Sequence, residues 1–292
     1  MKLYAPKYYK DFLCIADKCK HSCCVGWEID IDESTINKYA SLSEDYGQAI
    51  QQSITHDDCP HFTLTADEKC PHLDERGLCK IIKNVGEEYL CDICREHPRF
   101  YNFTSRSKEV GLGMACEEAC RIIISSDDFD QFIEIAELED TDLPEINFNA
   151  LEHRETLFNV LKDDTMSFDE KVGMIVDYYD IYITTRRSRN ALAKLEYLFS
   201  EHKELFSKFH IADNPNSDCQ KELSRILAYY IYRHSSEEED YYGFRSSVGF
   251  SLLCTMLVET ISEKSNIAEM ARIVSEEIEY SESNTALLKS LF

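Results

Sequence analysis

The cysteines of this chain are concentrated towards its N-terminus. Of 13 in a sequence of 292 residues, all but two lie between Cys14 and Cys120, many of them in tight groups. Such clusters are typical of bound metal or of disulfides. The first residues, Met1 to Lys10, lack the apolar core of a secretory signal. We therefore expect a cytoplasmic protein, and in a reducing cytosol clustered cysteines favour metal ligation over disulfides.

Charge and hydropathy limit the partners. The net charge of −24 argues against nucleic acid, because binding a phosphate backbone requires a cationic face. It suits a soluble enzyme or a protein that binds cationic groups. We also expect no membrane span, since the apolar run from Leu252 to Ile261 is short and interrupted by polar residues.

The composition divides the chain into two predicted regions. Residues 1–135 mix cysteines with turn residues, which is typical of an irregular, loop-rich fold held around ligands. Two short helices are expected within it, one beginning after Asp32 and one over Asp92–His97, which Pro98 would end. Residues 136–149, acidic and containing Pro144, are the predicted linker.

Residues 145–292 carry the apolar spacing of amphipathic helices. Three stripes follow it: Val172, Ile175, Val176 and Tyr179; Leu223, Ile226, Leu227, Tyr230 and Ile231; and Leu252, Leu253, Met256, Leu257 and Ile261. A second break is expected over residues 210–218. The predicted fold is mainly α: a cysteine-rich, loop-rich, metal-binding part over 1–135, followed by a helical bundle over 145–292.

The cysteine spacing indicates several ligand pairs. Cys91 and Cys94 lie about one helical turn apart, and Cys70 and Cys79 flank a predicted turn at Gly77. Four such sulfurs would suit tetrahedral zinc. Adjacent Cys23 and Cys24 are expected to point in different directions. The candidate ligands exceed the needs of one zinc ion, so two metals, or an iron–sulfur cluster with a structural site, both remain open. They are Cys14, Cys19, Cys23, Cys24, Cys70, Cys79, Cys91, Cys94 and Cys116.

Common cofactor motifs are missing. The CxxxCxxC triplet of radical S-adenosylmethionine enzymes does not occur, because Gly26 stands where Cys19 and Cys23 would require a third cysteine. There is no GxGxxG or P-loop, and nine glycines in the chain argue against a Rossmann-type nucleotide domain.

Several blocks together resemble the flagellin lysine-N-methylase family, which belongs with a wider CxxCxxCC group of proposed zinc- or iron-chelating proteins. They are Tyr9-Lys10-Asp11-Phe12-Leu13-Cys14, Cys23-Cys24-Val25-Gly26-Trp27-Glu28-Ile29-Asp30, Cys70-Pro71-His72-Leu73-Asp74, Gly77-Leu78-Cys79-Lys80, Glu88-Tyr89-Leu90-Cys91-Asp92-Ile93-Cys94-Arg95, Met114-Ala115-Cys116-Glu117 and Tyr229-Tyr230-Ile231-Tyr232-Arg233-His234. Cys14 and Cys19 depart from the wider group's spacing. Cys59, Cys120, Cys219 and Cys254 lie outside the blocks, and Cys219 and Cys254 are expected in the helical core.

The resemblance implies transfer of a methyl group from S-adenosylmethionine to lysine side chains of flagellin, with a cysteine-ligated 4Fe-4S cluster; zinc is the alternative. A non-catalytic zinc- or iron-binding module is the rival function. Within these blocks, Arg95 and Arg99 are candidates to bind the carboxylate of S-adenosylmethionine, or to form surface ion pairs.

Methyl transfer requires a neutral lysine amine, and the block residues that could remove its proton are Glu28, Asp30, Tyr89 and His97. The aromatic group at Tyr229, Tyr230 and Tyr232, with Arg233 and His234, could line a substrate cleft. Aromatic stripes at helical spacing more often belong to the core, and we favour the core for these tyrosines.

Overall fold

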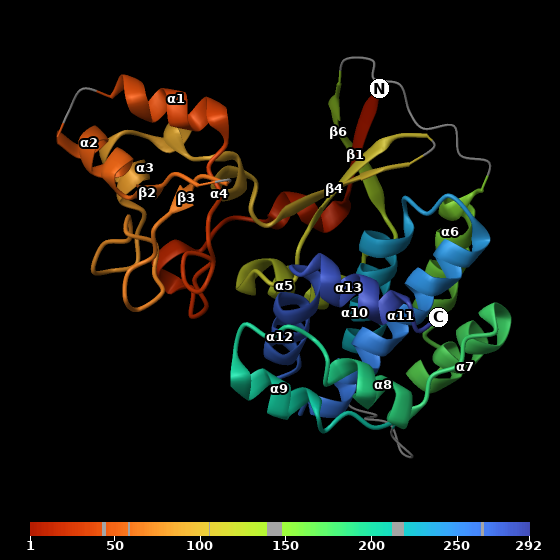
Figure 1. The fold of residues 1–292 in the computed structure, drawn as a ribbon. Coiled ribbons are helices and arrows are strands. Elements are labelled where there is room, and N and C mark those ends of the chain that lie inside the picture. Colours follow the sequence, from red (N-terminus) through yellow and green to blue (C-terminus); the bar gives the residue numbers. More distant parts are fainter. Residues whose placement is uncertain (43–44, 58, 105, 139–147, 212–218, 264–265) are drawn as a thin grey trace. The chain divides into compact units, whose positions relative to one another are not determined.

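The computed structural model describes residues 1–292 except 43–44, 58, 105, 139–147, 212–218 and 264–265. The described part is mainly helical, as predicted, with thirteen α-helices. It forms two compact units (Figure 1): unit 1 combines Met1–Phe12 with Arg99–Phe292, and unit 2 is Leu13–Pro98. Residues 139–147 of the predicted linker lie outside the described residues, as do 212–218 of the second predicted break.

Unit 2 is built from short elements around a small core. Its helices are α1 (Glu33–Ser41), α2 (Asp45–Gln52), α3 (Lys80–Asn84) and α4 (Asp92–Glu96), with 3-10 turns η2 (Ala16–Lys18) and η3 (Glu87–Tyr89) and a two-stranded ribbon of β2 (Ile54–Thr55) and β3 (His61–Phe62). Both predicted short helices are present. The Asp32 side chain caps α1 by accepting the Thr35 N–H at 2.9 Å, and α4 ends before Pro98.

Unit 1 contains a sheet that the sequence analysis did not predict. Its strand order is β4 (Arg99–Phe103), β5 (Lys108–Leu112), β1 (Lys2–Pro6) and β6 (Phe132–Glu137). Strand β1 runs parallel to β5 and antiparallel to β6, and the 3-10 turn η1 (Lys7–Asp11) follows β1. Because β1 pairs with strands about a hundred residues away, nothing local in the sequence specifies the sheet.

The sheet explains why the units differ from the predicted division at residues 136–149. The N-terminal strand and the segment after Pro98 pair within one sheet, so both belong with the helices, and only Leu13–Pro98 forms a separate unit. The cysteine-rich region is thereby divided, because Cys116 lies in unit 1.

The helices of unit 1 follow the predicted stripes. They are α5 (Glu117–Ser125), α6 (Ala150–Lys162), α7 (Phe168–Tyr179), α8 (Thr185–Leu192), α9 (Ser200–Phe206), α10 (Gln220–Ser235), α11 (Tyr241–Ile261), α12 (Ile267–Glu279) and α13 (Glu282–Lys289). The three predicted stripes lie on α7, α10 and α11, so the helices that they predicted are confirmed. Cys219 and Cys254 are buried, as predicted, and so are Tyr229, Tyr230 and Tyr232.

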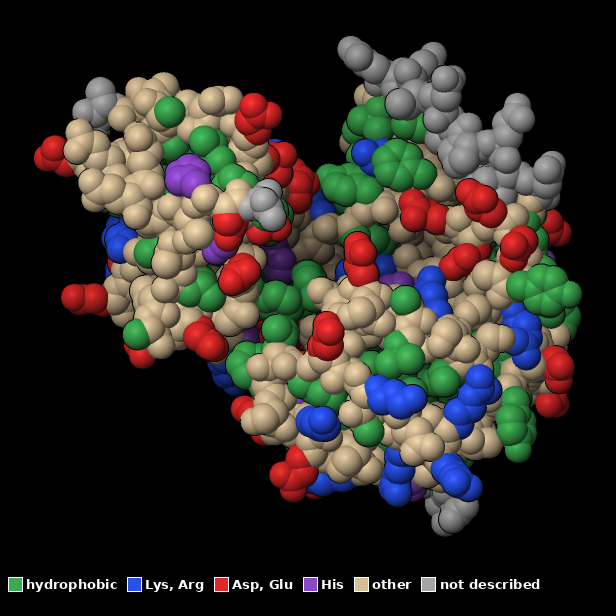
Figure 2. All heavy atoms as spheres, in the orientation of Figure 1, with side chains coloured by type: hydrophobic (Ala, Val, Ile, Leu, Met, Phe, Trp, Pro, Cys, Tyr) green, Lys and Arg blue, Asp and Glu red, His purple; other side chains and the backbone are tan. Residues whose placement is uncertain are grey.

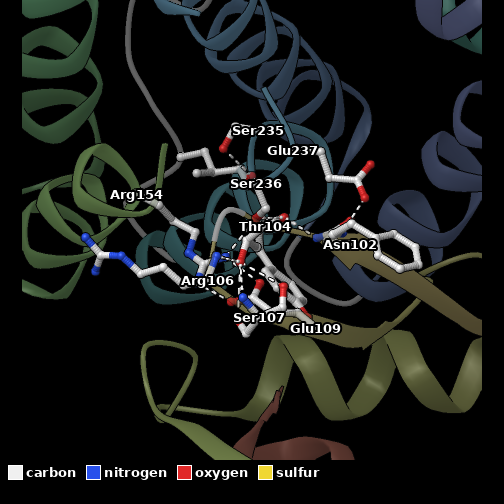
Figure 3. Close-up of polar contacts among 12 residues, drawn as sticks. Asn102, Thr104, Arg106, Ser107, Glu109, Arg154, Ser235, Ser236 and Glu237 are labelled. Carbon is white, nitrogen blue, oxygen red and sulfur yellow. Dashed lines mark hydrogen bonds and ion pairs between the residues drawn. The ribbon is translucent and has the colours of Figure 1, made fainter. Parts of the chain in front are cut away.

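One face of the sheet packs on α10. Phe100 and Phe132 contact the Tyr232 ring at centroid distances of 5.4 and 5.2 Å. A buried ion pair ties the same face to α6 (Figure 3): the Arg154 guanidinium donates to Glu109 Oε2 at 2.7 Å and to Oε1 at 2.9 Å. Arg154 also donates to Ser236 Oγ at 2.7 Å, so its charge is held by two neighbours on separate elements.

Helix α11 is long and apolar enough, by length and composition, to cross a membrane, which the sequence analysis did not expect. Phe244, Val248 and Phe250 extend the apolar run beyond Leu252–Ile261. However, 67% of the relevant window is buried inside the fold, and α11 packs against α10 and α12. A core helix shows the same composition, because it is apolar on most of its sides.

Candidate functional site

Five of the nine candidate cysteine ligands are neighbours in unit 2: Cys24, Cys70, Cys79, Cys91 and Cys94. We call these five residues the thiol group. The backbone N–H of Cys70 donates to the Cys24 carbonyl at 2.8 Å, and the Cys94 thiol is hydrogen-bonded to the Cys91 sulfur. Cys70 and Cys91 are buried in the core of the unit, and the other three pack against it.

Local structure brings Cys70 and Cys79 together as predicted. Gly77 adopts φ = +76°, which a glycine tolerates, and its N–H donates to the Asp74 carbonyl at 2.9 Å. The chain then returns, so that Leu73 and Cys79 form an isolated bridge. Cys79 and Cys91 are the N-cap residues of α3 and α4.

The pKa of each thiol in the thiol group depends on burial and on the neighbouring sulfurs. Burial, with smaller contributions from Cys24, Cys79 and Cys91, raises the pKa of the Cys70 thiol to about 12. Burial likewise raises the pKa of Cys79. The Cys91–Cys94 hydrogen bond lowers the pKa of Cys91 and raises that of Cys94. The thiol group therefore resists ionisation of all its members at once unless a cation compensates the charge.

Backbone N–H groups point at three of the sulfurs and favour the thiolate form. The N–H of His72 lowers the pKa of Cys70, those of Ile81 and Ile82 lower that of Cys79, and that of Cys94 lowers that of Cys91. Hydrogen bonds of this kind orient and tune cysteine ligands of iron–sulfur clusters.

Two tyrosines border the thiol group, and the sequence analysis missed both. Tyr39 is buried and donates to the Tyr89 carbonyl at 2.8 Å. Burial raises the pKa of Tyr46 to about 12, and the Cys79 and Cys70 sulfurs contribute. Tyr39 belongs to α1 and Tyr46 to α2, and neither helix contains a cysteine. The spacing of the cysteines therefore gave no signal for these tyrosines.

The other four candidate ligands, Cys14, Cys19, Cys23 and Cys116, are outside the thiol group as defined above. Cys14 is exposed, and the Cys19 thiol donates to the His21 carbonyl at 3.1 Å. Cys23 is exposed, yet its thiol is hydrogen-bonded to Cys24 and lowers the pKa of Cys24 to about 7. Of these two adjacent side chains, Cys24 packs against the core of unit 2, whereas Cys23 is exposed. Cys116 lies in unit 1 as the N-cap of α5.

The described cysteines form neither disulfides nor a closed metal site. All 13 lie in the described part of the chain, and none is in a disulfide there. Among the described residues, no group of three or more His, Cys, Asp or Glu side chains is gathered so that it could hold a metal ion.

The candidate acids and bases fall in different surroundings. Glu28 and Asp30 are exposed. The backbone of Asp30 forms an isolated antiparallel β-bridge with that of His61. The pKa of His61 is raised by its hydrogen bond to the Cys59 carbonyl, with smaller contributions from Asp57, Glu28 and Asp30. Tyr89 ends η3, and its carbonyl accepts the Tyr39 hydroxyl. The last candidate base, His97, is the C-cap of α4.

The two candidate donor-binding residues, Arg95 and Arg99, belong to different units. Arg95 is exposed and forms ion pairs with Asp92 and, at 3.4 Å, with Glu96. Arg99, in unit 1, donates to the Tyr9 hydroxyl at 2.8 Å.

A buried polar cluster in unit 1 was missed by the sequence analysis. Its centre is Glu279 at the end of α12, which accepts His234 Nε2 at 2.6 Å and the Tyr229 hydroxyl at 2.9 Å and pairs with Arg233 Nε at 3.3 Å. Burial opposes ionisation, but Arg233 and His234 outweigh it and lower the pKa of Glu279. The block Tyr229–His234 lies on α10, and we call it the α10 block. Its contacts with Glu279 give it a structural role, because they fix α10 to α12.

A surface cavity of about 290 Å³ in unit 1 contains none of the predicted residues. Its lining comes from the α6–α7 connection, the first turn of α7 and the start of α10: Asp164, Thr165, Met166, Ser167, Lys171, Gln220 and Lys221. The cavity is therefore separate from the chemistry that the cysteines indicate.

Comparison with known proteins supports the resemblance. The chain is 28% identical over 130 residues, 42% of its length, to proteins named lysine-N-methylase from Salmonella choleraesuis and Salmonella typhimurium. It is equally similar to the flagellar biosynthetic protein FliU of Salmonella muenchen, covering 77% of that protein. The match spans about a third, 32%, of the two lysine-N-methylases. No family model matches the chain, and no solved structure does. The predicted resemblance to the flagellin lysine-N-methylase family is thus confirmed over this stretch.

Proposed function

We propose that this protein is an S-adenosylmethionine-dependent protein lysine N-methyltransferase, that flagellin is its substrate, and that it binds a 4Fe-4S cluster in the cytoplasm. The reaction class is supported by the similarity to proteins named lysine-N-methylase, and the flagellar substrate by the similarity to FliU. Because the match covers only part of those proteins, the activity of this chain has to be measured directly.

The observation that supports the cofactor is the thiol group itself. Buried sulfurs with backbone N–H donors behind them fit the ligand set of a metal or an iron–sulfur cluster. A single zinc ion requires four ligands within about 2.3 Å of one point, and the described side chains do not converge in that way. A cluster takes each thiolate on a different iron, so its ligands stand farther apart. Four of the five cysteines of the thiol group, Cys24, Cys70, Cys79, Cys91 and Cys94, would hold a 4Fe-4S cluster, one on each iron.

In the transfer itself, the lone pair of a neutral lysine amine forms a bond to the methyl carbon of S-adenosylmethionine, the carbon–sulfur bond breaks, and S-adenosylhomocysteine leaves. The protein must first accept a proton from the lysine ammonium. Glu28 and Asp30 are exposed, so both carboxylates are accessible to such a substrate. Arg99 remains a candidate for the carboxylate of the donor. The ion pairs of Arg95 with Asp92 and Glu96 favour a surface role for that residue.

The test combines metal analysis with an activity measurement. The protein is purified without oxygen, and its iron, sulfide, zinc and visible spectrum are measured with and without S-adenosylmethionine. Flagellin is then incubated with protein and donor and examined by mass spectrometry for added methyl groups of 14 Da each. We expect matched iron and sulfide, a spectrum that responds to the donor, and methylated lysines.

The contrary results are equally specific. A colourless zinc protein that is indifferent to the donor and leaves flagellin unmodified would support the non-catalytic metal-binding module instead. Cys94→Ala should lose the cluster, whereas Cys59→Ala, an exposed cysteine outside the thiol group, serves as the matched control. Full methyl transfer by a metal-free Cys94→Ala protein would exclude a catalytic cluster.

A further inference from the structure

Two Tyr-Tyr pairs that are far apart in the sequence lie together in unit 1. Tyr178 and Tyr179 end α7, and Tyr241 and Tyr242 begin α11. The rings form a continuous series: centroids are 4.9 Å apart for Tyr178–Tyr179, 6.3 Å for Tyr179–Tyr241 and 5.9 Å for Tyr241–Tyr242. We call these four residues the tyrosine series.

The tyrosine series has a buried centre and exposed ends. Tyr179 is 1% exposed, whereas Tyr178 and Tyr242 are 65% and 78% exposed and Tyr241 is 39% exposed. His153 supports the centre, because its Nδ1 lies 3.1 Å from the Tyr179 hydroxyl. The outer rings are therefore presented to solvent on a fixed base, and they form a contiguous exposed aromatic surface rather than scattered single residues.

Carboxylates flank both pairs. Asp177 and Asp180 bracket the first, Glu239 and Asp240 precede the second, and all four are exposed. Asp240 also caps α11 by accepting the Gly243 N–H at 2.8 Å, which fixes its position beside Tyr241. In Figure 2, acidic, basic and hydrophobic side chains lie close together at the right of the view.

In the described part of the chain, the faces of these rings have no Lys or Arg side chain over them. Elsewhere in unit 1, Lys108 Nζ lies over the rings of Tyr101 and Phe103 at 4.5 and 4.8 Å. Within the described residues, no lysine or arginine is placed in this way over the tyrosine series. Arg245 of α11 also contacts this region: its Nε donates to the Tyr179 carbonyl at 2.8 Å, and its guanidinium donates to the Asp180 carbonyl, so it faces the backbone.

We infer that the tyrosine series and its four carboxylates form a docking surface for a lysine-rich segment of a protein substrate. An ammonium group binds to the face of a tyrosine ring, and adjacent carboxylates strengthen the attraction. The inference rests on the proposed function, because it names the surface that would hold the lysine-bearing protein. The charge of the surface argues against a second copy of this acidic chain as the occupant.

The test uses a labelled 15-residue peptide with five lysines and a matched peptide in which glutamine replaces them. Binding to the full chain is measured by fluorescence anisotropy at low and high salt. We expect the lysine peptide alone to bind, and salt to weaken its binding. Tyr178→Ala and Tyr242→Ala should each weaken it about two- to fivefold, whereas Tyr242→Phe, which keeps the ring, should bind as wild type does.

The controls separate this surface from general charge. Tyr182 is 73% exposed and, within the described residues, makes no ring contact with the tyrosine series, so Tyr182→Ala should leave affinity unchanged. Asp177→Asn combined with Glu239→Gln should weaken binding mainly at low salt. Equal binding of both peptides, equal losses at Tyr182, or self-association that disappears in Tyr242→Ala would each overturn the inference.

The same variants distinguish failure of the surface from failure of the proposed function. Suppose that the wild-type protein methylates flagellin and that the double variant Tyr178→Ala, Tyr242→Ala does so with an unchanged KM. The inferred docking surface is then wrong, and the proposed function stands. If no methylation occurs but the lysine peptide binds through these tyrosines, the function is wrong and the surface stands.

Discussion

Breaking the buried Arg154–Glu109 ion pair should destabilise unit 1 far more than it changes any surface property. Both side chains are almost fully buried, with 7% and 5% of their surface exposed, and Arg154 lies over the Phe132 ring at 4.6 Å. In Arg154→Met the Glu109 carboxylate would lose its two guanidinium bonds and remain in the core without compensation. Removing one partner of such a pair costs about 3–5 kcal/mol.

The magnitude can be measured because the two units carry different probes. The chain has one tryptophan, Trp27, which lies in unit 2, whereas most helical residues are in unit 1. Far-UV circular dichroism in urea therefore reports mainly on unit 1. With a slope of about 2–3 kcal/mol per molar urea, the midpoint should fall by roughly 1–2 M. The Trp27 fluorescence transition provides the internal reference.

A double variant makes the reasoning refutable. Replacing both partners, Arg154→Met with Glu109→Leu, leaves no buried charge and should recover much of the lost stability. If the single variant costs less than about 1 kcal/mol, or if the double variant costs the sum of the two single ones, the pair does not act as a buried ion pair. Arg121→Met, which breaks an exposed pair with Glu118, is the control.

Three further predictions concern caps, packing and pH. Asp32→Ala, which removes the cap of α1 and a bond to the Asp92 N–H at 3.0 Å, should cost unit 2 about 1–2 kcal/mol by Trp27 fluorescence; an unchanged midpoint would contradict this. Gly111→Ala places a Cβ 2.3 Å from Phe100 Cζ and should cost about 1–3 kcal/mol by circular dichroism, whereas Gly173→Ala meets nothing within 4 Å and should stabilise α7 slightly. Because the folded pKa of Glu279 lies below its usual value of 4.5, its stabilisation is complete above that value and is lost as pH falls through the folded pKa. Glu279→Gln should therefore flatten the loss of stability as pH falls below 4.5, and an unaltered profile would exclude the assignment.

The parts of the fold that the sequence predicted are those specified by local patterns. Helices α7, α10 and α11 place an apolar residue on one face every three or four positions, and this periodicity is set within each segment. The start of α1 depends on Asp32 alone, through its own side chain. The sheet could not be predicted in the same way, because β1 has only five residues and its partners lie beyond residue 107.

The candidate site shows the same limit. The pairing of Cys91 with Cys94 follows from one helical turn, and that of Cys70 with Cys79 from a turn that requires a glycine. The addition of Cys24 to these four depends on a hydrogen bond between backbones 46 residues apart, from Cys70 N–H to the Cys24 carbonyl. Spacing could not show that Cys14 and Cys19 are absent from the group, nor that Glu279 meets the α10 block.

The thiol group belongs to the core of unit 2 and is also the proposed ligand set, and a loss-of-activity measurement alone would confuse these two effects. Cys70 and Cys91 are part of the hydrophobic core of unit 2, together with Tyr39, Ile50 and Phe62, and protonated thiols pack there as small apolar groups. Substituting a buried cysteine therefore removes packing as well as a potential ligand. Cys94 is less buried than Cys91, so its substitution separates the two effects best. If Cys94→Ala loses iron while Trp27 reports an unchanged unfolding midpoint for the metal-free protein, the cysteine acts through the metal; a lowered midpoint in metal-free protein would mean that packing carries the effect.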